Sequence, residues 1–355
     1  MKITSVHACL VPIDLGKPYT IAYETVDCAE NVFLCLETNH GPCAFGCAAP
    51  DRAVTNETAA GTLERVAETI EPCLKGADPL KRMAVLNELL PALEPYPSAL
   101  AMVDMALYDL LGKRAGLPLF QLLGGFRECI TTSMTIGILP LEETLSAAKA
   151  HVRQGFMALK IKGGIDVDAD IEKMVRLRKV LGSHVQLRFD ANQGYTADQA
   201  RQFLQGTSTA DLELFEQPTP REDFDLLGQI TRQSDIHVMA DESLMGVRDV
   251  FRLAKNGLAD MVNIKLMNTG GIDRAIQIHA VARTAGIDTM VGCMDESALA
   301  IAAGLHFALS RPGITHADLD GHLDLLGDPA SGAVLLNKGV LYPTGRPGLG
   351  FDPQL

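Results

Sequence analysis

The sequence predicts an α/β protein in which a small α+β domain precedes a barrel of eight parallel strands. After Gly124 and Gly125, short apolar runs alternate with amphipathic helical stretches, an alternation typical of parallel strands joined by crossover helices. Eight such runs follow one another, and about 200 residues are enough to close a barrel. The polar residues that end five successive runs are spaced at intervals of 28, 26, 25 and 24 residues: Lys162, Asp190, Glu216, Asp241 and Lys265.

The eight expected strands are short and evenly placed along the second part of the chain. They are residues 132–136, 158–162, 186–190, 212–216, 237–241, 261–265, 288–291 and 314–318. An open, doubly wound sheet is the alternative topology, because it also alternates strands with helices. The regular spacing of eight units favours the barrel.

The first part of the chain has a different texture. Two alternating apolar runs, residues 3–13 and 31–38, predict strands, and the polar residues 15–27 between them predict a loop. Helical periodicities then begin at three positions: Glu57, Leu80 and Ala99. This mixture indicates a separate α+β domain.

Three regions follow from these patterns. We expect the α+β domain at residues 1–125, the barrel at residues 126–321 and a C-terminal segment at residues 322–355. Within that segment, residues 339–342 alternate as a strand does, and Pro and Gly follow at residues 346–350. We expect the segment to return to the first domain as an added strand and turn.

Composition and charge limit the classes of partner. The chain has 355 residues, 47% of them hydrophobic, and 44 acidic residues against 31 basic ones give a formal charge of −13. Such a field repels phosphate backbones and anionic lipids, so we expect no nucleic acid and no membrane, and it favours cationic ligands. No apolar stretch reaches the roughly 18 residues of a membrane span, and the first residues lack the features of an export signal. Eight cysteines without a CxxC pair indicate reduced thiols in the cytoplasm.

Lys160 and Lys162 flank Ile161 in one of the expected strands. Because side chains alternate along a strand, both amines share a face at its C-terminal end, where barrel enzymes keep their active sites. At about 7 Å and an effective dielectric near 20, their repulsion is roughly 2 kcal/mol, which should lower the pKa of one amine. A nearby divalent cation would lower that pKa further, toward about 8, as suits a lysine base. The alternative is a solvated lysine pair.

Three acids, Asp190, Glu216 and Asp241, end three successive strands. Carboxylates converging at one edge repel each other strongly unless a cation lies between them. Oxygen ligands with open positions left for water or a substrate carboxylate suit Mg²⁺. The three residues therefore predict a magnesium site, the alternative being that each acid separately caps the helix after its strand.

Lys265 ends the strand after these three acids, across a barrel from Lys162. Two lysines on opposite sides of a metal-bound carboxylate suit a two-base proton transfer. One lysine removes the proton from the α-carbon on one face, and the other returns a proton to the opposite face. The alternative for Lys265 is a counter-ion to the acids.

These residues occur in five short motifs. They are KIK at 160–162, DANQG at 190–194, EQP at 216–218, ADES at 240–243 and NIK at 263–265. Through them the whole chain resembles the muconate-lactonizing subgroup of the enolase superfamily, which is known for lysine bases and Mg²⁺. The resemblance implies a (β/α)7β modified TIM barrel with an α+β capping domain built from both chain ends. It also implies that Lys162, Lys265 and Lys160 are catalytic.

The eighth strand distinguishes between members of that subgroup. Asp318-Leu319-Asp320 resembles the Asp-x-Asp pattern of dipeptide epimerases, in which the paired carboxylates receive the free α-ammonium of the dipeptide. Two carboxylates at i and i+2 can bind a cation with charge-assisted hydrogen bonds. The alternative is a coincidental acidic turn before Gly321. The resemblance therefore implies a Mg²⁺-dependent isomerase that acts on small dipeptides, and we expect a homo-oligomer.

The side chain at the second position of the dipeptide is predicted from charge. Aligned through residues 23–26, Glu24 falls where relatives that act on Ala-Glu carry an arginine, and Asp295 falls where they carry an apolar residue. Two extra acids favour a dipeptide with Lys or Arg at its second position. Thr135 and Asp51 are further candidates for this pocket. The alternative is that these acids lie on exposed loops outside the site.

Two other classes of function fit the same motifs. An N-acylamino acid racemase or a muconate cycloisomerase of the same subgroup shares the lysines and metal ligands, but its substrate carries no ammonium group for Asp318 and Asp320. A non-catalytic barrel is the second alternative, because a fold alone never proves a function. Exchange of the substrate α-hydrogen with solvent deuterium separates the enzymes from the binding protein.

Overall fold

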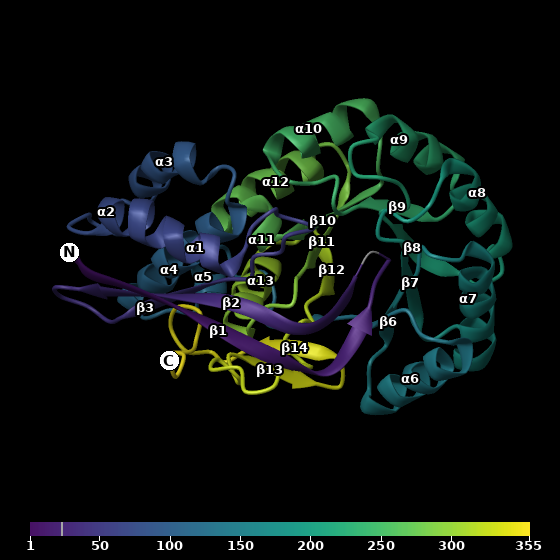
Figure 1. Ribbon diagram of the computed structural model, residues 1–355, viewed down its shortest axis with the longest axis horizontal. Coiled ribbons are helices and arrows are strands. Elements are labelled where there is room, and N and C mark those ends of the chain that lie inside the picture. The colour runs from purple at the N-terminus through teal and green to yellow at the C-terminus, as the bar shows by residue number, and fades with distance from the viewer. Residues whose placement is uncertain (23) are drawn as a thin grey trace.

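The computed structural model describes residues 1–22 and 24–355, and its largest element is a parallel sheet of eight strands in chain order (Figure 1). The strands are β5 (Met134–Ile136), β6 (Ala158–Lys162), β7 (Gln186–Asp190), β8 (Leu212–Glu216), β9 (His237–Ala240), β10 (Met261–Lys265), β11 (Asp288–Gly292) and β12 (Ile314–Asp318). Next to β5, Ser133 N donates to the carbonyl of Ala317 in β12 at 3.1 Å, and Thr132 bridges the same residue. The sheet is therefore closed into the predicted barrel, and the open doubly wound sheet is excluded.

A helical connection follows each of the first seven strands in the described chain, as in a (β/α)7β barrel. These helices are α6 (Leu141–Gln154), α7 (Val167–Leu181), α8 (Ala197–Gly206), α9 (Phe224–Gln233), α10 (Val247–Asn256), α11 (Leu266–Thr269) with α12 (Ile272–Thr284), and α13 (Ala298–Ser310). Figure 1 shows α6 to α10 around the outside of the strands. Helix α13 is buried along its whole length, because the capping domain and the C-terminal segment cover the side that faces away from the barrel.

The capping domain packs an antiparallel sheet against helices. Its strands are β1 (Ile3–Thr20), β2 (Thr25–Thr38) and β3 (Ala44–Ala48), and its helices are α1 (Ala59–Arg65), η1 (Val66–Ile70), α2 (Glu71–Leu74), α3 (Arg82–Leu93), α4 (Pro97–Ala115) and α5 (Leu119–Leu122). A Cβ atom at Gly46 in β3 would lie 2.0 Å from the carbonyl oxygen of Met102 in α4. The absence of a side chain there lets strand and helix touch.

The prediction of a loop at residues 15–27 is wrong, because most of these residues belong to strands. β1 continues to Thr20 and β2 begins at Thr25, so that Tyr19 pairs with Val26. The apolar side chain that stabilises this part of the hairpin comes from far away in the sequence, since Leu15 packs in a small cluster with Leu325. Figure 1 shows the hairpin extending from the capping domain to the barrel strands.

The C-terminal segment contacts both larger parts. Strands β13 (Val334–Asn337) and β14 (Val340–Pro343) form a sheet with β4 (Ile130–Thr131), which precedes the barrel. The strand expected at residues 339–342 thus pairs beside the barrel, whereas the following residues reach the capping domain, where Gly348 N donates to the Leu117 carbonyl at 3.0 Å. None of the described helices has the length and apolar character needed to cross a membrane.

Candidate active site

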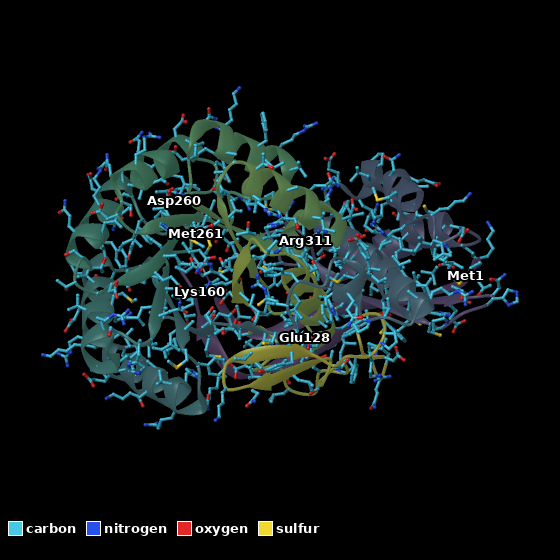
Figure 2. The ribbon with its side chains drawn as sticks, turned by 180° about the vertical axis from the view of Figure 1, so that it is seen from behind. Met1, Glu128, Lys160, Asp260, Met261 and Arg311 are labelled. Carbon is cyan, nitrogen blue, oxygen red and sulfur yellow. The ribbon has the colours of Figure 1, made fainter. Side chains whose placement is uncertain are left out.

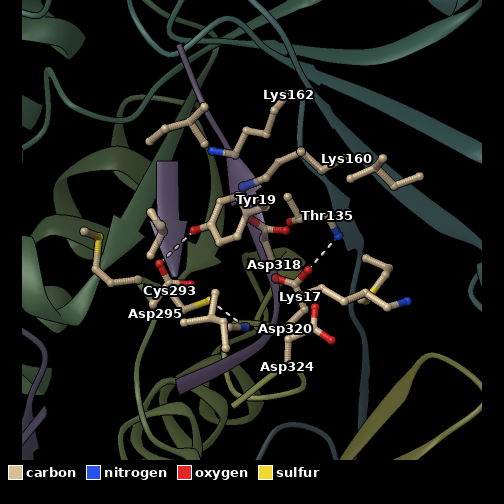
Figure 3. Close-up of a pocket in the computed structure, with 18 of the residues that line it drawn as sticks. Lys17, Tyr19, Thr135, Lys160, Lys162, Cys293, Asp295, Asp318, Asp320 and Asp324 are labelled. Carbon is tan, nitrogen blue, oxygen red and sulfur yellow. Dashed lines mark hydrogen bonds and ion pairs between the residues drawn. The ribbon is translucent and has the colours of Figure 1, made fainter. Parts of the chain in front are cut away.

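A cavity of about 590 Å³ lies at the C-terminal ends of the barrel strands, where the hairpin of β1 and β2 reaches the barrel. It is lined by side chains from the strand ends, the hairpin and the start of the C-terminal segment (Figure 3). Nine residues singled out in the sequence line this cavity: Glu24, Asp51, Thr135, Lys160, Lys162, Lys265, Asp295, Asp318 and Asp320. The three predicted metal ligands lie beside them, because they ion pair with the same lysines.

The alternation of β6 directs Lys160 and Lys162 into the cavity, and both side chains are buried. Lys162 Nζ donates to Asp190 Oδ2 at 2.7 Å, whereas Lys160 forms an ion pair with Asp318 and lies 3.8 Å from Glu216 Oε2. Burial opposes the charge of Lys160, but the carboxylates of Asp318 and Glu216 outweigh it and raise its pKa well above the usual value. The sequence predicts a lowered pKa for one amine of the pair, and Lys160 is not that amine, because the carboxylate of Asp318 at the end of β12 outweighs the repulsion.

Lys265 enters the cavity from the end of β10, and its Nζ lies 2.7 Å from Asp241 Oδ2. In the strand order of the closed barrel, three strands separate β10 from β6 in each direction. Lys265 and Lys162 therefore come from opposite sides of the barrel.

Asp190 and Glu216 end β7 and β8, and Asp241 directly follows β9. All three are fully buried and offer carboxylate oxygens within 4.8 Å of one another. Asp190 Oδ1 accepts from Asn192 N at 2.8 Å, and Glu216 Oε1 accepts from Asn263 Nδ2 at 2.7 Å. By contrast, Glu216 Oε2 and Asp241 Oδ1 accept no hydrogen bond from any described residue.

Buried anionic oxygens without donors are strongly unfavourable unless a cation pairs with them. Burial, followed by the negative charge of Asp190, raises the pKa of Glu216 to about 8. Three clustered carboxylates that supply only oxygen atoms fit a hard divalent cation such as Mg²⁺. This arrangement fits the magnesium site expected from the sequence.

Asp318 and Asp320 both line the cavity, but they differ in charge compensation. Asp318 ends β12, accepts from Ser133 Oγ at 2.5 Å and pairs with Lys160; although burial alone would raise its pKa, Lys160 lowers it to about 2. Asp320 lies beyond the strand and accepts from Thr135 N at 2.6 Å, and burial together with the charge of Asp318 raises its pKa to about 6. The sequence pattern treats the two as equals, whereas Asp320 is the carboxylate without an ammonium partner among the described residues.

Three more acids meet at the outer part of the cavity. Asp295, in the loop after β11, accepts from the Tyr19 hydroxyl at 2.7 Å. Burial, followed by the charges of Asp51 and Asp295, raises the pKa of Glu24, so these carboxylates are close enough to repel one another. Tyr23, the first residue of the alignment used for Glu24, lies outside the described residues.

Several residues of the cavity were not expected from the sequence. Lys17 and Tyr19 lie on the part of β1 predicted as a loop, and Asp324 joins them because Gly16 N donates to its carbonyl at 2.7 Å. No local pattern indicates that contact. Asn192 and Glu242 also line the cavity; they belong to the DANQG and ADES motifs, but the motifs predicted no role for them.

Comparison with known families agrees with this fold and site. Residues 3–124 match "Mandelate racemase / muconate lactonizing enzyme, N-terminal domain", and residues 143–354 match "Enolase C-terminal domain-like". The chain therefore belongs to the mandelate racemase and muconate lactonizing enzyme family of the enolase superfamily. This confirms the resemblance deduced from the lysine and acid motifs.

Individual relatives are similar over nearly their whole length. The chain is 41% identical over 351 residues to the L-Lys-D/L-Arg epimerase of Desulforapulum autotrophicum, covering 99% of each chain. It superposes on a substrate-liganded L-Ala-D/L-Glu epimerase from Bacillus subtilis with a TM-score of 0.97, at 35% identity and 100% coverage of both chains. A dipeptide epimerase from Enterococcus faecalis, complexed with Mg and L-Leu-L-Tyr, gives a TM-score of 0.96, at 37% identity and 99% coverage of both chains.

Proposed function

We propose that this protein is a magnesium-dependent dipeptide epimerase, an isomerase that inverts the α-carbon of the C-terminal residue by a two-base 1,1-proton transfer. The observation that carries the proposal is the placement of Lys162 and Lys265 on opposite sides of the barrel, each paired with a member of the same acid cluster. The epimerase activity named for relatives at 35 to 41% identity supports it.

Asp190, Glu216 and Asp241 would hold the cation. A bound Mg²⁺ would stabilise the negative charge that develops on the substrate carboxylate when the α-proton is removed. The Mg and dipeptide found together in the Enterococcus relative support this assignment.

The lysines divide the proton chemistry between two faces of the substrate. Lys162 removes the α-proton from one epimer while Lys265 protonates the opposite face, and the roles reverse for the other epimer. Lys160 has a different role, because its amine pairs with Asp318 at the end of β12, whereas Lys162 and Lys265 each pair with an acid of the proposed metal site. It supplies a fixed positive charge beside the substrate carboxylate rather than acting as a base.

The free α-ammonium of the dipeptide would bind at Asp320. This carboxylate lines the cavity and has one backbone donor, Thr135 N, so it can accept a charge-assisted hydrogen bond from an ammonium. Asp318 does not bind the ammonium itself; it forms an ion pair with Lys160 and so holds that lysine in place.

The preferred substrate is a dipeptide whose second residue has a cationic side chain. Glu24, Asp51 and Asp295 repel one another in the free protein, and a Lys or Arg side chain would relieve that repulsion. The net charge of −13 acts in the same direction by attracting cationic dipeptides. The Lys-Arg activity named for the Desulforapulum relative supports this preference.

Incubation in D₂O tests the function directly. With Mg²⁺, the purified protein should exchange and epimerise the α-hydrogen of the second residue in L-Ala-L-Lys, and kcat/KM should be lower for L-Ala-L-Glu. N-acetyl-L-lysine, which lacks the α-ammonium, should react slowly, and EDTA should stop the exchange.

Each part of the proposal has its own contrary result. No exchange with any dipeptide or with N-acetyl-L-lysine would exclude an epimerase and a racemase, and would leave the muconate cycloisomerase and the non-catalytic barrel. Faster reaction of N-acetyl-L-lysine than of L-Ala-L-Lys would indicate an N-acylamino acid racemase. A preference for L-Ala-L-Glu would overturn the charge argument alone.

Two further proposals concern location and assembly. A cytoplasmic enzyme agrees with eight free cysteines, five of them at least partly accessible along the first domain. A homo-oligomer stays a prediction, and its molar mass can be measured by light scattering coupled to size-exclusion chromatography. The expected absence of a nucleic-acid partner also stays a prediction.

A further inference from the structure

We propose that Tyr19 is a positioning residue for substrate specificity, which holds Asp295 in place to receive the cationic side chain of the second residue. The inference rests on the proposed function, because it concerns how that site recognises its substrate. It assigns a role to the β1 end of the hairpin, which the sequence pattern predicted to be an irregular loop.

The contact joins two segments that are 276 residues apart. The Tyr19 hydroxyl donates to Asp295 Oδ2 at 2.7 Å (Figure 3). Among the described residues, no other group donates a hydrogen bond to this carboxylate. The second carboxylate oxygen of Asp295 is therefore left for a ligand, in the part of the cavity that Glu24 and Asp51 also line.

The loop that carries Asp295 is held separately through its backbone. Asn31 Nδ2 donates to the Asp295 carbonyl at 3.2 Å, and Asn31 Oδ1 accepts from Ser297 N at 2.9 Å. Asn31 lies on β2 and Tyr19 on β1, so one strand of the hairpin fixes the loop and the other fixes the carboxylate. Removing the tyrosine hydroxyl should therefore change the orientation of the side chain without moving the loop.

The hydrogen bond also favours the charged form of Asp295. Burial raises the pKa of Asp295, and the strongest opposing influence is the hydrogen bond from Tyr19. Burial and the negative charge of Asp295 raise the pKa of Tyr19 well above its usual value, so the hydroxyl stays a donor. A charged, oriented carboxylate is what a substrate ammonium or guanidinium requires.

The barrel also holds the backbone beside Tyr19, through the loop after β5. Ile138 N, in the loop after β5, donates to the Thr20 carbonyl at 2.8 Å. A Cβ atom on Gly137 would lie 3.0 Å from the Tyr19 Cβ atom, so the glycine allows the strand to approach this closely. Tyr19 is thus anchored at the β5 loop and points across the cavity to the β11 loop.

Tyr19→Phe tests the proposal, because it removes only the hydroxyl. The ratio of kcat/KM for L-Ala-L-Lys to that for L-Ala-L-Met, a neutral unbranched substrate, should fall about tenfold, as expected when one hydrogen bond to a charged group is lost. The fall should come from KM for the cationic substrate, with kcat changed by less than about twofold. Tyr342→Phe on β14, outside the cavity, is the matched control and should leave the ratio unchanged.

A double-mutant cycle separates positioning from a general structural effect. In an Asp295→Asn background, adding Tyr19→Phe should change the ratio little, because the hydroxyl acts through the carboxylate. Equal losses for both substrates, or additive effects in the cycle, would overturn the proposal. A wild-type protein that prefers L-Ala-L-Lys while Tyr19→Phe retains the full ratio would refute the role of Tyr19 and leave the proposed function intact. A wild-type protein inactive on all dipeptides would refute the function itself.

Discussion

Lys162 and Lys265 each hold a buried ion pair of 2.7 Å with a different acid of the same cluster. Two lysines on opposite sides of one anionic centre would place one amine at each face of a substrate α-carbon, so that the neutral amine accepts a proton on one face while the ammonium donates one on the other. The chemistry is symmetrical, although the two lysines come from strands more than 100 residues apart in sequence.

Single lysine substitutions should separate the two faces. Lys162→Met and Lys265→Met should each lower epimerisation by about 10²- to 10⁴-fold, the range for loss of a positioned acid or base. Each variant should exchange the α-hydrogen of only one epimer in D₂O, and the two variants should spare opposite epimers. Mass spectrometry of the L,L and L,D substrates measures this, with Lys255→Met on the exposed side of α10 as control. Equal exchange of both epimers by Lys265→Met would contradict the two-base assignment.

Glu24 provides the residue-scale test of charge recognition. Glu24→Arg places a cation where the proposed substrate presents one, so kcat/KM for L-Ala-L-Lys should fall by about tenfold or more, as for loss of a charge-assisted contact. The value for L-Ala-L-Glu should fall less or rise. Glu30→Arg, an exposed change on β2 outside the cavity, should alter neither. Parallel losses for both substrates would mean that Glu24 does not face the second side chain.

At the scale of elements, the capping domain depends on close contact between strand and helix. β3 lies against α4, and Gly46 faces the backbone of the helix, where an added Cβ atom would meet Met102 O at 2.0 Å and Ala106 N at 3.1 Å. Backbone atoms cannot rotate away as a side chain can. The glycine therefore sets the distance between the two elements, and through α4 it supports the sheet that carries the hairpin.

Gly46→Ala should destabilise the protein by about 1 to 3 kcal/mol, the usual result of overpacking a core. Urea unfolding followed by circular dichroism would show a lower midpoint. Gly246→Ala is the matched control, since its Cβ atom would meet no described atom within 4 Å and its φ of −177° is open to any residue. If both variants unfolded at the same urea concentration, the contact of β3 with α4 would not limit stability.

For the whole molecule, an ion-pair cluster joins the capping domain to the barrel. Arg82 of α3 lies 3.1 Å from Asp104 of α4 and 3.2 Å from Asp273 of α12, and its guanidinium stacks over Tyr108. Asp273 N also donates to Asp104 at 3.0 Å. Since α11 and α12 follow β10 directly, the cluster links the capping domain to the segment just after Lys265, one of the proposed bases.

This cluster predicts a pH dependence of stability. Burial outweighs the attraction of Arg82 and raises the pKa of Asp104 to about 7, above the ordinary value of 3.8. A carboxyl group whose pKa is raised by folding stabilises the protein below its unfolded pKa, and that stabilisation is lost as the pH rises to the folded pKa. The melting temperature of the wild type minus that of Asp104→Asn should therefore decrease between about pH 4 and pH 7, measured at constant salt and Mg²⁺. A difference that increases over this range would show that Arg82 keeps Asp104 ionised throughout.

Much of the barrel and its inner site could be predicted because both follow local rules. Alternation along β6 directs Lys160 and Lys162 to one side, and parallel strands bring their C-terminal ends together, so the order of Asp190, Glu216 and Asp241 already implies a cluster. The residues around these acids also identified the family.

The hairpin and the outer part of the cavity could not be predicted in the same way. Residues 15–27 look polar and irregular because β1 there faces a cavity on one side and Leu325 on the other, which removes the alternation that normally reveals a strand. The ion pair of Lys160 with Asp318 joins residues 158 apart, and no local pattern predicts that it raises the pKa of Lys160.

The amino-acid sequence by itself determined the class of fold, the positions of the two opposed lysines and the three clustered acids, and the excess of acidic residues. Only the tertiary structure decided which carboxylate of the Asp318 and Asp320 pair lacks an ammonium partner, which tyrosine holds Asp295, and how the capping hairpin meets the barrel. The physical reason is range: strand period and strand order repeat every few residues or every β/α unit, whereas these contacts join parts of the chain that meet only after the barrel has closed.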